Sequence, residues 1–490
     1  MFELTVLPGK AVDEEANDRF PENVINNNYN FYSQNARCIP EGLRYAEKSL
    51  LGEQIDKWIE YVPSCYKGES AAPLVITMHG GGQSAWHQFY TTSWIEVAEK
   101  NNVIIVSPDA PKDHVWQTPA GERATDENLY EVKFLKALLV EIKNKYKIDE
   151  KRIYMQGMSL GDQMTLHFAR LYGDMLAGIA CCAGPIAPEC LFDKAGKPRE
   201  CKVSMPVYQY RGEFDRLMFK AGPSCRTRYD LNRANLLFWQ KRNGSTGIPE
   251  IFLEGEDNIA IYRDGEADIV YHDVYQYGHG QTLDSAEFIW NRFFSGLILG
   301  QKHVEDCLES VNKESTVAAV ALNCPYMYAN GQVSMINERS AVPDIMQKEI
   351  DLSRASKRFP GMDKPFEGLE FDPCVYVPLE FIVNTFLPEV EKREDGRVAM
   401  VLQDGRRIQI AAGSAACMID GRMWRMESHV RFENGQILLP LKWFTYCIFN
   451  WHYQQKGNII CISEKYGTLT DDMALLLLEI MEEGRNRNDD

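Results

Sequence analysis

A serine set between two glycines is the residue of this sequence best suited to act as a nucleophile. Ser159 stands in the run Gly157-Met158-Ser159-Leu160-Gly161, which follows a short apolar strand pattern and precedes a helical pattern from about 162 to 172. A serine at a sharp strand-to-helix turn has a strained backbone, and the two glycines remove side chains that would clash there. Its Oγ would lie at a helix N-terminus, where developing negative charge is favoured. The pattern predicts a nucleophilic serine that forms an acyl intermediate.

A glycine-rich stretch earlier in the chain could stabilise the charge that such a reaction develops. The run His79-Gly80-Gly81-Gly82 directly follows a buried-strand pattern at 73–78. Glycines after a strand let backbone N–H groups approach a substrate oxygen closely. We therefore expect the amides of Gly81 and Gly82 to form an oxyanion hole with the amide of Leu160. The alternative is that the stretch is only a flexible turn with no chemical role. The serine turn later in the chain favours the oxyanion hole over this alternative.

A serine nucleophile requires a base, and the base requires a carboxylate that orients it. With a serine on this kind of turn, the other two residues follow in the order acid, then histidine. Asp215 lies in the loop after a strand pattern at 206–210, where an orienting carboxylate is expected. Glu213 lies in the same loop and is the close competitor, and Asp215 could also be an ordinary turn residue.

Three histidines follow this loop and could supply the base. His272 lies inside a strand pattern, and His303 falls after the last helical pattern of this region. His279 lies between a strand and a helix, with glycines on both sides that let an imidazole approach the serine. The sequence therefore predicts a catalytic triad of Ser159, Asp215 and His279.

Aromatic residues near the predicted oxyanion hole have two interpretations. Trp86 and Trp116, with Phe89 and Tyr90, could line a pocket for the acyl group of a substrate. Large aromatic residues are equally common in the packed core. The sequence leaves both interpretations open and makes Trp86 and Trp116 candidate substrate-binding residues.

Strand and helix patterns alternate through the first three fifths of the chain. Strands are expected at 57–63, 73–78, 103–106, 152–158, 176–183, 206–210 and 269–277, and helices at 93–101, 126–146, 162–172, 228–242 and 284–296. This alternation predicts an α/β fold with a doubly wound, mostly parallel sheet. The candidate site residues would then gather at the carboxyl ends of the strands.

Residues 57–296 resemble the polyhydroxybutyrate depolymerase and feruloyl esterase group of α/β-hydrolases. The resemblance depends on ordered motifs: Tyr61-Val62-Pro63, Pro73 to Gly82, Ile148-Asp149-Glu150, Arg152-Ile153-Tyr154, Gly157 to Gly161, Pro206-Val207, Gly212 with Asp215, Gly278-His279 and Ile289-Trp290. It implies an α/β-hydrolase fold and a triad of Ser159, Asp215 and His279 that acts on feruloyl, acetyl or hydroxyalkanoate-type esters. Asp162 departs from the group, in which a small residue is more usual at this position.

The C-terminal part contains an internal repeat. The segment at 375–382 matches the segment at 437–444, with prolines at 378 and 440, and each copy leads into a short helix and then a hairpin, expected at 391–402 and 453–462. The repeat resembles the copper amine oxidase N-terminal-like domain, a small α+β module, which implies a bacterial surface enzyme and a contact with carbohydrate or polymer. His429 and His452 have no ligand spacing, so no copper is expected. We divide the chain into an irregular segment at 1–40, a catalytic domain at 41–300, a linker at 301–340 and an accessory domain at 341–490.

Composition excludes several other classes of function. The chain has 490 residues and a net charge of −17, which argues against nucleic acid and anionic membranes as partners. No run of apolar residues is long enough for a transmembrane helix, and the start lacks the pattern of a signal peptide. The sequence as given thus predicts a cytoplasmic protein, whereas the resemblance implies a secreted or surface location. No metal or other cofactor is expected.

The 13 cysteines contain no zinc-binding spacing. Cys190 and Cys201 could pair in an oxidising compartment, although mostly reduced thiols are favoured.

Two alternatives to a serine esterase remain at this stage. The same fold and triad also serve peptidases, so an acyl-peptide hydrolase is the first, although no propeller or lid is recognisable. A binding protein with an inactive hydrolase domain is the second, and the presence of all the triad residue types disfavours it.

Overall fold

The computed structural model describes residues 9–11, 38–40, 42–118, 129–183, 190–193, 195–215, 227–301, 317–322, 324–336, 344–346, 374–393 and 395–488. The chain forms two compact units. The first comprises Met1–Pro249 and Ile259–Lys313, and the second comprises Glu250–Asn258 and Glu314–Asp490.

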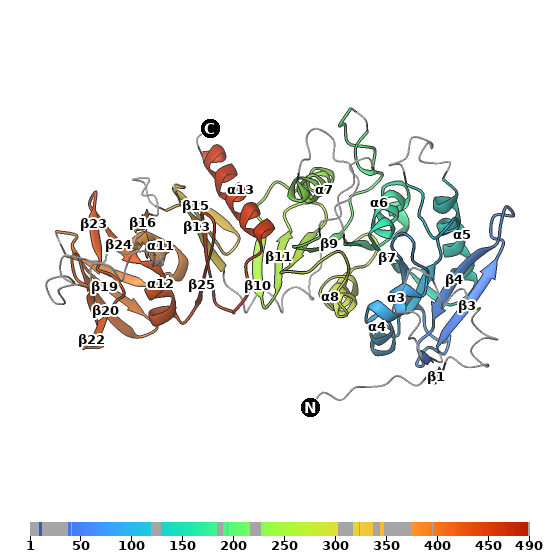
Figure 1. The fold of residues 1–490 in the computed structure, drawn as a ribbon, viewed down its shortest axis with the longest axis horizontal. Helices are drawn as coiled ribbons and strands as arrows, with labels where there is room; N and C mark the ends of the chain where they lie inside the picture. Colours follow the sequence, from blue (N-terminus) through green and yellow to red (C-terminus); the bar gives the residue numbers. More distant parts are fainter. Residues whose placement is uncertain are drawn as a thin grey trace, which may run out of the picture. The chain divides into compact units, whose positions relative to one another are not determined.

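A ten-stranded sheet organises the chain from β3 to β12 (Figure 1). Its strands, in spatial order, are β10 (Glu250–Glu254), β11 (Asp257–Tyr262), β12 (Ile269–Val274), β9 (Val207–Gly212), β8 (Gly178–Cys182), β7 (Ile148–Met158), β5 (Ala72–Met78), β6 (Ile104–Pro108), β4 (Asp56–Tyr61) and β3 (Leu43–Lys48). The six strands from β12 to β6 pair in parallel, whereas β4 pairs antiparallel with β6 and with β3. The predicted mostly parallel sheet of an α/β-hydrolase fold is confirmed.

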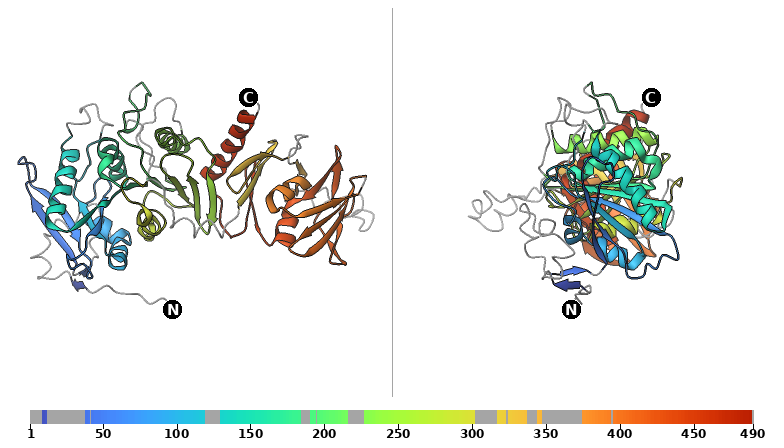
Figure 2. Two further views of the ribbon diagram at one scale, coloured as in Figure 1. Left: turned by 180° about the vertical axis from the view of Figure 1, so that it is seen from behind. Right: turned by 90° about the vertical axis from the view of Figure 1, so that its right-hand side faces the viewer.

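Helices cover both faces of this sheet (Figures 1 and 2). On one face lie α5 (Tyr130–Lys145), α6 (Leu160–Tyr172) and α7 (Arg228–Asn243), and on the other lie α3 (His87–Thr91), α4 (Trp94–Asn101) and α8 (Ser285–Arg292). The 3₁₀ turns η3 (Gly173–Met175) and η5 (Phe294–Gly296) follow α6 and α8. Because both faces are covered, every residue of β5, β6, β8, β9 and β12 is buried. This burial explains why β5, β6 and β8 are mostly apolar, whereas β9 and β12 also bury polar side chains such as Arg211 and His272.

The second unit is built from small sheets whose described pairings are antiparallel. One sheet orders β15 (Gln332–Met335), β14 (Tyr326–Ala329), β13 (Val317–Ala321), β26 (Ile459–Ser463) and β25 (His452–Lys456). A second orders β16 (Asp344–Met346), β17 (Cys374–Pro378), β24 (Gln436–Pro440) and β23 (Arg431–Glu433). A third runs from β18 (Glu389–Lys392) through β19 (Val398–Gln403), β20 (Arg406–Ala411) and β21 (Ala416–Ile419) to β22 (Arg422–Arg425). Its helical elements are α11 (Leu379–Phe386), α12 (Leu441–Phe444), the π-helical turn η6 (Thr445–Phe449) and α13 (Asp471–Asn488).

The internal repeat appears in this unit as two matching strand–helix segments. Strand β17 leads into α11 and strand β24 leads into α12, and the two strands pair antiparallel with Val377 opposite Leu439. The ends of the two segments also meet, because the rings of Phe386 and Phe449 stack with centroids 3.5 Å apart. The predicted hairpins are present as β18–β19 and β25–β26.

The boundaries of the units differ from the predicted domains in two places. Residues 317–335, which the sequence placed in a linker, form β13, β14 and β15 of an ordered sheet. Residues 250–258, which it placed in the catalytic domain, group with the second unit. There the N–H of Ile251 donates to Tyr328 Oη at 2.8 Å, and Gly255 bridges to Gly467. Hydropathy patterns identify strands, but they do not show which partner a strand will pair with.

A short two-stranded sheet, β1 (Gly9–Ala11) with β2 (Cys38–Pro40), lies within the segment predicted as irregular. Cys190 and Cys201 are free thiols, so they do not form the disulfide that the sequence allowed in an oxidising compartment.

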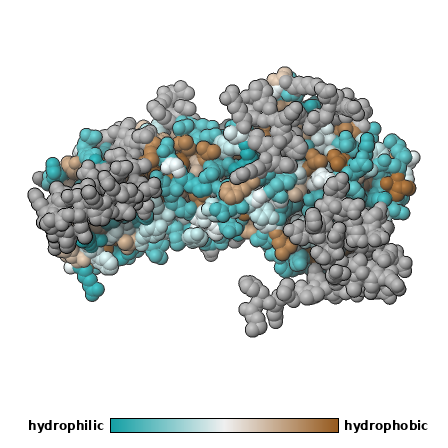
Figure 3. Space-filling view, in the orientation of Figure 1, coloured by the Kyte–Doolittle hydropathy of each residue, from teal (hydrophilic) through white to brown (hydrophobic). Residues whose placement is uncertain are grey.

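On the face shown in Figure 3, the coloured residues are mostly hydrophilic, and hydrophobic ones occur in small separate groups. None of the described helices is both long and apolar enough to span a bilayer.

Candidate active site

Ser159 lies at a sharp turn between β7 and α6, as the sequence predicts. Its backbone has φ 56° and ψ −114°, a conformation that non-glycine residues rarely adopt. The N–H of Ser159 donates to the carbonyl oxygens of Cys182 (2.9 Å) and Ala183 (3.1 Å) at the end of β8. The strained turn is therefore held by the neighbouring strand.

The two glycines of the motif are required by close backbone contacts. A Cβ on Gly157 would lie 2.1 Å from the carbonyl oxygen of Gly161, and a Cβ on Gly161 would lie 2.5 Å from that of Met78. Real Cβ atoms essentially never approach so closely, so alanine at either position would displace the turn.

The structure brings the three predicted triad residues together. Nε2 of His279 lies 2.9 Å from Oγ of Ser159, and Nδ1 of His279 lies 3.0 Å from Oδ2 of Asp215. The side chain of Asp215 is 1% exposed, whereas that of His279 is 27% exposed. A buried carboxylate thus orients an imidazole that faces the serine, the arrangement needed to activate a hydroxyl as a nucleophile.

The competing candidates point elsewhere. The carboxylate of Glu213 accepts the backbone N–H of Gln276 at 2.9 Å, a contact that fixes the turn before His279. His272 is fully buried in β12, and its Nδ1 lies 2.7 Å from Tyr208 Oη. His303 lies outside the described residues.

The glycine-rich loop lies beside the serine turn. A Cβ on Gly81 would lie 2.5 Å from the Leu160 side chain, so the main chains of Gly81 and Leu160 are neighbours. The amide of Leu160 is the first of α6, where N–H groups have no partner within the helix. This geometry places the amides of Gly81 and Leu160 at the same edge of the sheet as Ser159.

Gly82 differs from its predicted role in the oxyanion hole. Its N–H donates to the carbonyl oxygen of His114 at 2.8 Å, so this amide is already used within the protein. The amide of Gly80 likewise donates to Gln83 Oε1 at 2.8 Å. A glycine run shows where the backbone can approach a ligand, but it does not show which amide points toward it. The candidate donors that remain are Gly81 and Leu160.

The two tryptophans predicted to bind substrate are buried. Trp86 is 3% exposed and Trp116 is 2% exposed. The indole N–H of Trp116 donates to the carbonyl oxygen of His79 at 2.9 Å, and its ring contacts the His79 ring. Core packing therefore accounts for Trp116, whose contacts with His79 hold the start of the glycine loop.

Asp109 is a structural residue of the site that the sequence did not single out. Its Oδ1 lies 3.3 Å from His79 Nε2 and 3.1 Å from His114 Nδ1, and it accepts the N–H of Ala85 at 3.3 Å. Burial raises the pKa of Asp109, but hydrogen bonds from His114 and His79 outweigh it and lower the pKa to about 2. Asp109 therefore holds the glycine loop as an ionised carboxylate. Its place directly after β6, at the catalytic edge, was the available signal.

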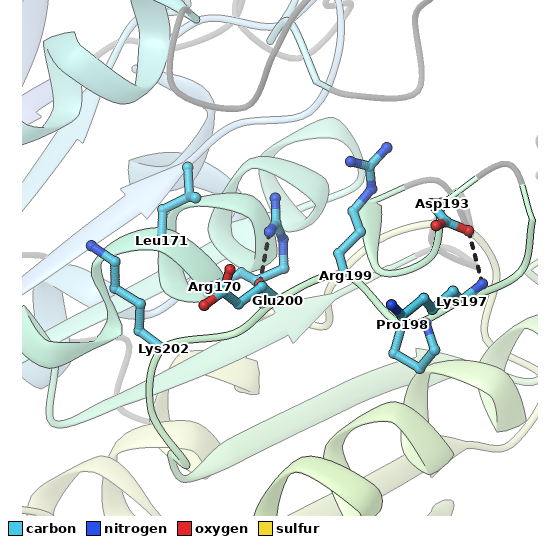
Figure 4. Close-up of a pocket in the computed structure, with 8 residues that line it drawn as sticks. All are labelled: Arg170, Leu171, Asp193, Lys197, Pro198, Arg199, Glu200 and Lys202. Atoms are coloured by element: carbon cyan, nitrogen blue, oxygen red, sulfur yellow. Dashed lines mark hydrogen bonds between the residues drawn. The ribbon is translucent and has the colours of Figure 1, made fainter.

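A cavity of about 550 Å³ lies at the other end of α6 (Figure 4). It is lined by Arg170, Leu171, Asp193, Lys197, Pro198, Arg199, Glu200 and Lys202. Since α6 has 13 residues, its two ends are about 20 Å apart, so this cavity is separate from Ser159. Its arginines hold the surrounding loop: Arg170 donates to the carbonyl oxygen of Glu200 at 2.8 Å and Arg199 to that of Phe192 at 3.2 Å.

Among the residues that the structure describes, no group of three or more His, Cys, Asp or Glu side chains is arranged to hold a metal ion.

Comparisons with known families agree with the resemblances drawn from the sequence. Residues 65–219 match the Phospholipase/Carboxylesterase family, and residues 369–458 match the Copper amine oxidase N-terminal domain. The first range contains Ser159 and Asp215, and the second contains both copies of the repeat. Both resemblances are thereby confirmed.

Three curated relatives share part of the chain. Feruloyl esterase B of Piromyces equi is 29% identical over 217 residues, which cover 42% of this chain and 39% of that protein. A bifunctional acetylxylan esterase/xylanase of Neocallimastix patriciarum is 27% identical and covers 26% of this chain and 17% of that protein. Poly(3-hydroxyalkanoate) depolymerase C of Paucimonas lemoignei is 30% identical and covers 27% and 30%. The chain spans less than half the length of each relative.

Among solved structures, an acetyl xylan esterase from Aspergillus awamori matches with a TM-score of 0.41 and 13% identity, over 52% of this chain and 98% of that one. The feruloyl esterase module from Clostridium thermocellum matches with a TM-score of 0.36 and 12% identity, over 59% and 95%.

Proposed function

We propose that this chain is a serine-dependent carboxylic ester hydrolase. The observation that carries the proposal is the chain of contacts from Asp215 through His279 to Ser159, with heavy-atom distances of 3.0 and 2.9 Å. A serine in a strained turn at a helix N-terminus, bonded to an imidazole that a buried carboxylate orients, has the geometry of an acyl-transfer site.

The reaction follows from the position of each group. His279 Nε2 takes the proton of Ser159 Oγ as the oxygen attacks the ester carbonyl carbon. The carbonyl oxygen becomes an oxyanion, which the amides of Gly81 and Leu160 would stabilise by hydrogen bonds. When the tetrahedral intermediate collapses, the imidazolium of His279 gives its proton to the departing alcohol, and an acyl-serine remains.

Water completes the cycle. His279 removes a proton from the water as it attacks the acyl-serine, and the collapse of the second tetrahedral intermediate returns the proton to Ser159 and releases the acid. Asp215 remains ionised and stabilises the imidazolium in both steps. No group outside the chain is needed for proton transfer.

The proposed substrates are feruloyl, acetyl or hydroxyalkanoate-type esters, small or polymeric. Support for this range comes from the relatives, which are named as a feruloyl esterase, an acetylxylan esterase and a poly(3-hydroxyalkanoate) depolymerase. The second unit is proposed to contact carbohydrate or polymer. The support is that residues 369–458 match the Copper amine oxidase N-terminal domain and are joined to the proposed catalytic unit in one chain, so binding there would raise the effective concentration of a polymeric substrate. Ser159, Asp215 and His279 all belong to the first unit.

A panel of substrates tests the proposal. Methyl ferulate, p-nitrophenyl acetate, p-nitrophenyl 3-hydroxybutyrate and aminoacyl p-nitroanilides should be offered to the wild-type chain and to Ser159→Ala. We expect hydrolysis of at least one ester by the wild type and none above background by the variant. Faster cleavage of the anilides than of every ester would identify a peptidase instead. Inactivity toward the whole panel would favour a binding protein.

A further inference from the structure

A buried ion pair joins two elements that carry residues of the proposed triad. Asp162 stands in the first turn of α6, three residues after Ser159, and Arg211 stands in β9, four residues before Asp215. Nη1 of Arg211 lies 3.4 Å from Oδ2 of Asp162, and each side chain is 1% exposed. Both side chains are therefore held in the interior, where removing charged groups from water costs free energy.

Arg211 also connects the elements that carry the triad. Its Nη1 donates to the carbonyl oxygens of Cys181 in β8 and of Tyr210 in β9, both at 3.1 Å. The two residues after Cys181 supply the carbonyl oxygens that accept the Ser159 amide, and the amide of Ala183 in turn donates to Tyr210 at 3.0 Å. One guanidinium nitrogen thus bonds α6, the end of β8 and β9 at the point where Ser159 and Asp215 depart.

Stability alone does not account for this pair. Removing two charges from water is expensive, and well-packed apolar side chains often replace a buried pair without loss of stability. The hydrogen bonding is also incomplete: among the described residues, the Nε and Nη2 atoms of Arg211 have no hydrogen-bond partner, while the Cys181 thiol adds a hydrogen bond to Asp162. Burial raises the pKa of Asp162 to about 7 even though Arg211 opposes the shift. A costly, incompletely satisfied group close to a reactive site is typical of a functional constraint.

We propose that Asp162 and Arg211 are positioning residues, which fix the first turn of α6 against β8 and β9 so that Ser159 and Asp215 stay in reach of His279. This inference rests on the proposed function. Neither side chain takes part in a bond-making step. The pair acts through the backbone of the serine turn and through the strand that precedes the acid.

Single and double variants separate positioning from stability. Asp162→Asn and Arg211→Met should each lower kcat about 10- to 100-fold with little change in KM, because a misplacement of about 1 Å costs on this scale. The double variant Asp162→Leu/Arg211→Met removes both charges and should regain thermal stability without regaining kcat. Glu60→Gln is the matched control. Glu60 lies on β4, away from the triad, and its buried carboxylate oxygen Oε2 lies 2.7 Å from Nζ of Lys145. It should lower stability and leave kcat unchanged.

A second readout reports the triad geometry directly. The proton on Nδ1 of His279, shared with Asp215, should give a far-downfield resonance in the wild type that shifts or broadens in the double variant but not in Glu60→Gln. Retention of wild-type kcat and of this resonance by the double variant would show that the pair is only structural and overturn the inference. Wild-type protein that hydrolyses no ester would instead overturn the proposed function, and the inference with it, so the two failures are distinguishable.

Discussion

The assignment of Asp215 rather than Glu213 as the orienting acid can be tested by two isosteric changes. Asp215→Asn replaces a carboxylate whose Oδ2 lies 3.0 Å from His279 Nδ1 with an amide of nearly the same shape. An amide NH₂ that faces Nδ1 donates a hydrogen bond and cannot accept one, so it favours an unprotonated Nδ1. The proton of the neutral imidazole then lies on Nε2, the nitrogen that faces Ser159. In that tautomer His279 cannot act as the base.

The magnitude follows from this loss of orientation. Removal of the equivalent charge in other Ser-His-Asp triads lowers kcat about 10⁴-fold. We expect a similar loss here, because Asp215 is buried like the aspartate of those triads. At about 1.4 kcal/mol for each factor of ten, this corresponds to roughly 5 kcal/mol of transition-state stabilisation. The fold should persist, since the amide can still bond to the ring.

Glu213→Gln is the matched control from the same loop. Its carboxylate accepts the Gln276 backbone N–H at 2.9 Å, and a neutral amide oxygen can still accept this hydrogen bond. We expect kcat within a few-fold of wild type and a loss of stability of about 1 kcal/mol. Steady-state kinetics on one small soluble ester, with thermal unfolding of each variant, gives both quantities. If Glu213→Gln abolished turnover while Asp215→Asn stayed active, the acid would be wrongly assigned.

Three further predictions concern the surroundings of the site. Gly161→Ala should abolish hydrolysis and lower the melting temperature, because its Cβ would lie 2.5 Å from the Met78 carbonyl oxygen; a variant with wild-type turnover would contradict the described turn. The pKa of Asp109 is about 2 in the folded protein, below the ordinary 3.8. Asp109 should therefore add roughly 2 kcal/mol to the free energy of unfolding above pH 4, and this contribution should be lost as the pH falls through 2. Urea unfolding should therefore show the advantage of wild type over Asp109→Asn shrinking across that interval, and an unchanged difference would refute it. A chain truncated to residues 41–300 loses the Tyr328 hydroxyl that accepts the Ile251 amide, so it should melt below the full chain, whereas an equal melting temperature would favour the domain boundaries drawn from the sequence.

The parts of the site that depend on local backbone geometry could be predicted from the sequence. The glycines that flank Ser159 mark a point where the backbone must approach itself closely, and the strand patterns indicate the edge of the sheet at which the residues gather. Such constraints depend on residues close together in the sequence, so they can be recognised without the structure. The predicted Ser159, Asp215 and His279 do lie within hydrogen-bond distance of one another in the chain of contacts through His279.

The remaining features depend on partners distant in the chain. The Gly82 amide points toward the His114 carbonyl oxygen, to which it donates, and the buried indole of Trp116 donates to the His79 carbonyl oxygen. Likewise, the grouping of residues 250–258 with the second unit depends on contacts such as Ile251 with Tyr328. Neither periodicity nor composition specifies such pairings, so a single sequence cannot resolve them.

We propose Ser159 as the nucleophile of an acyl-transfer reaction. The most direct measurement is labelling of the intact chain with a fluorophosphonate probe, followed by proteolysis and mass mapping of the modified peptide. We predict one adduct per chain, on Ser159, that is absent from Ser159→Ala and forms much more slowly in His279→Ala. An adduct on any other serine, with ester hydrolysis retained by Ser159→Ala, would contradict it.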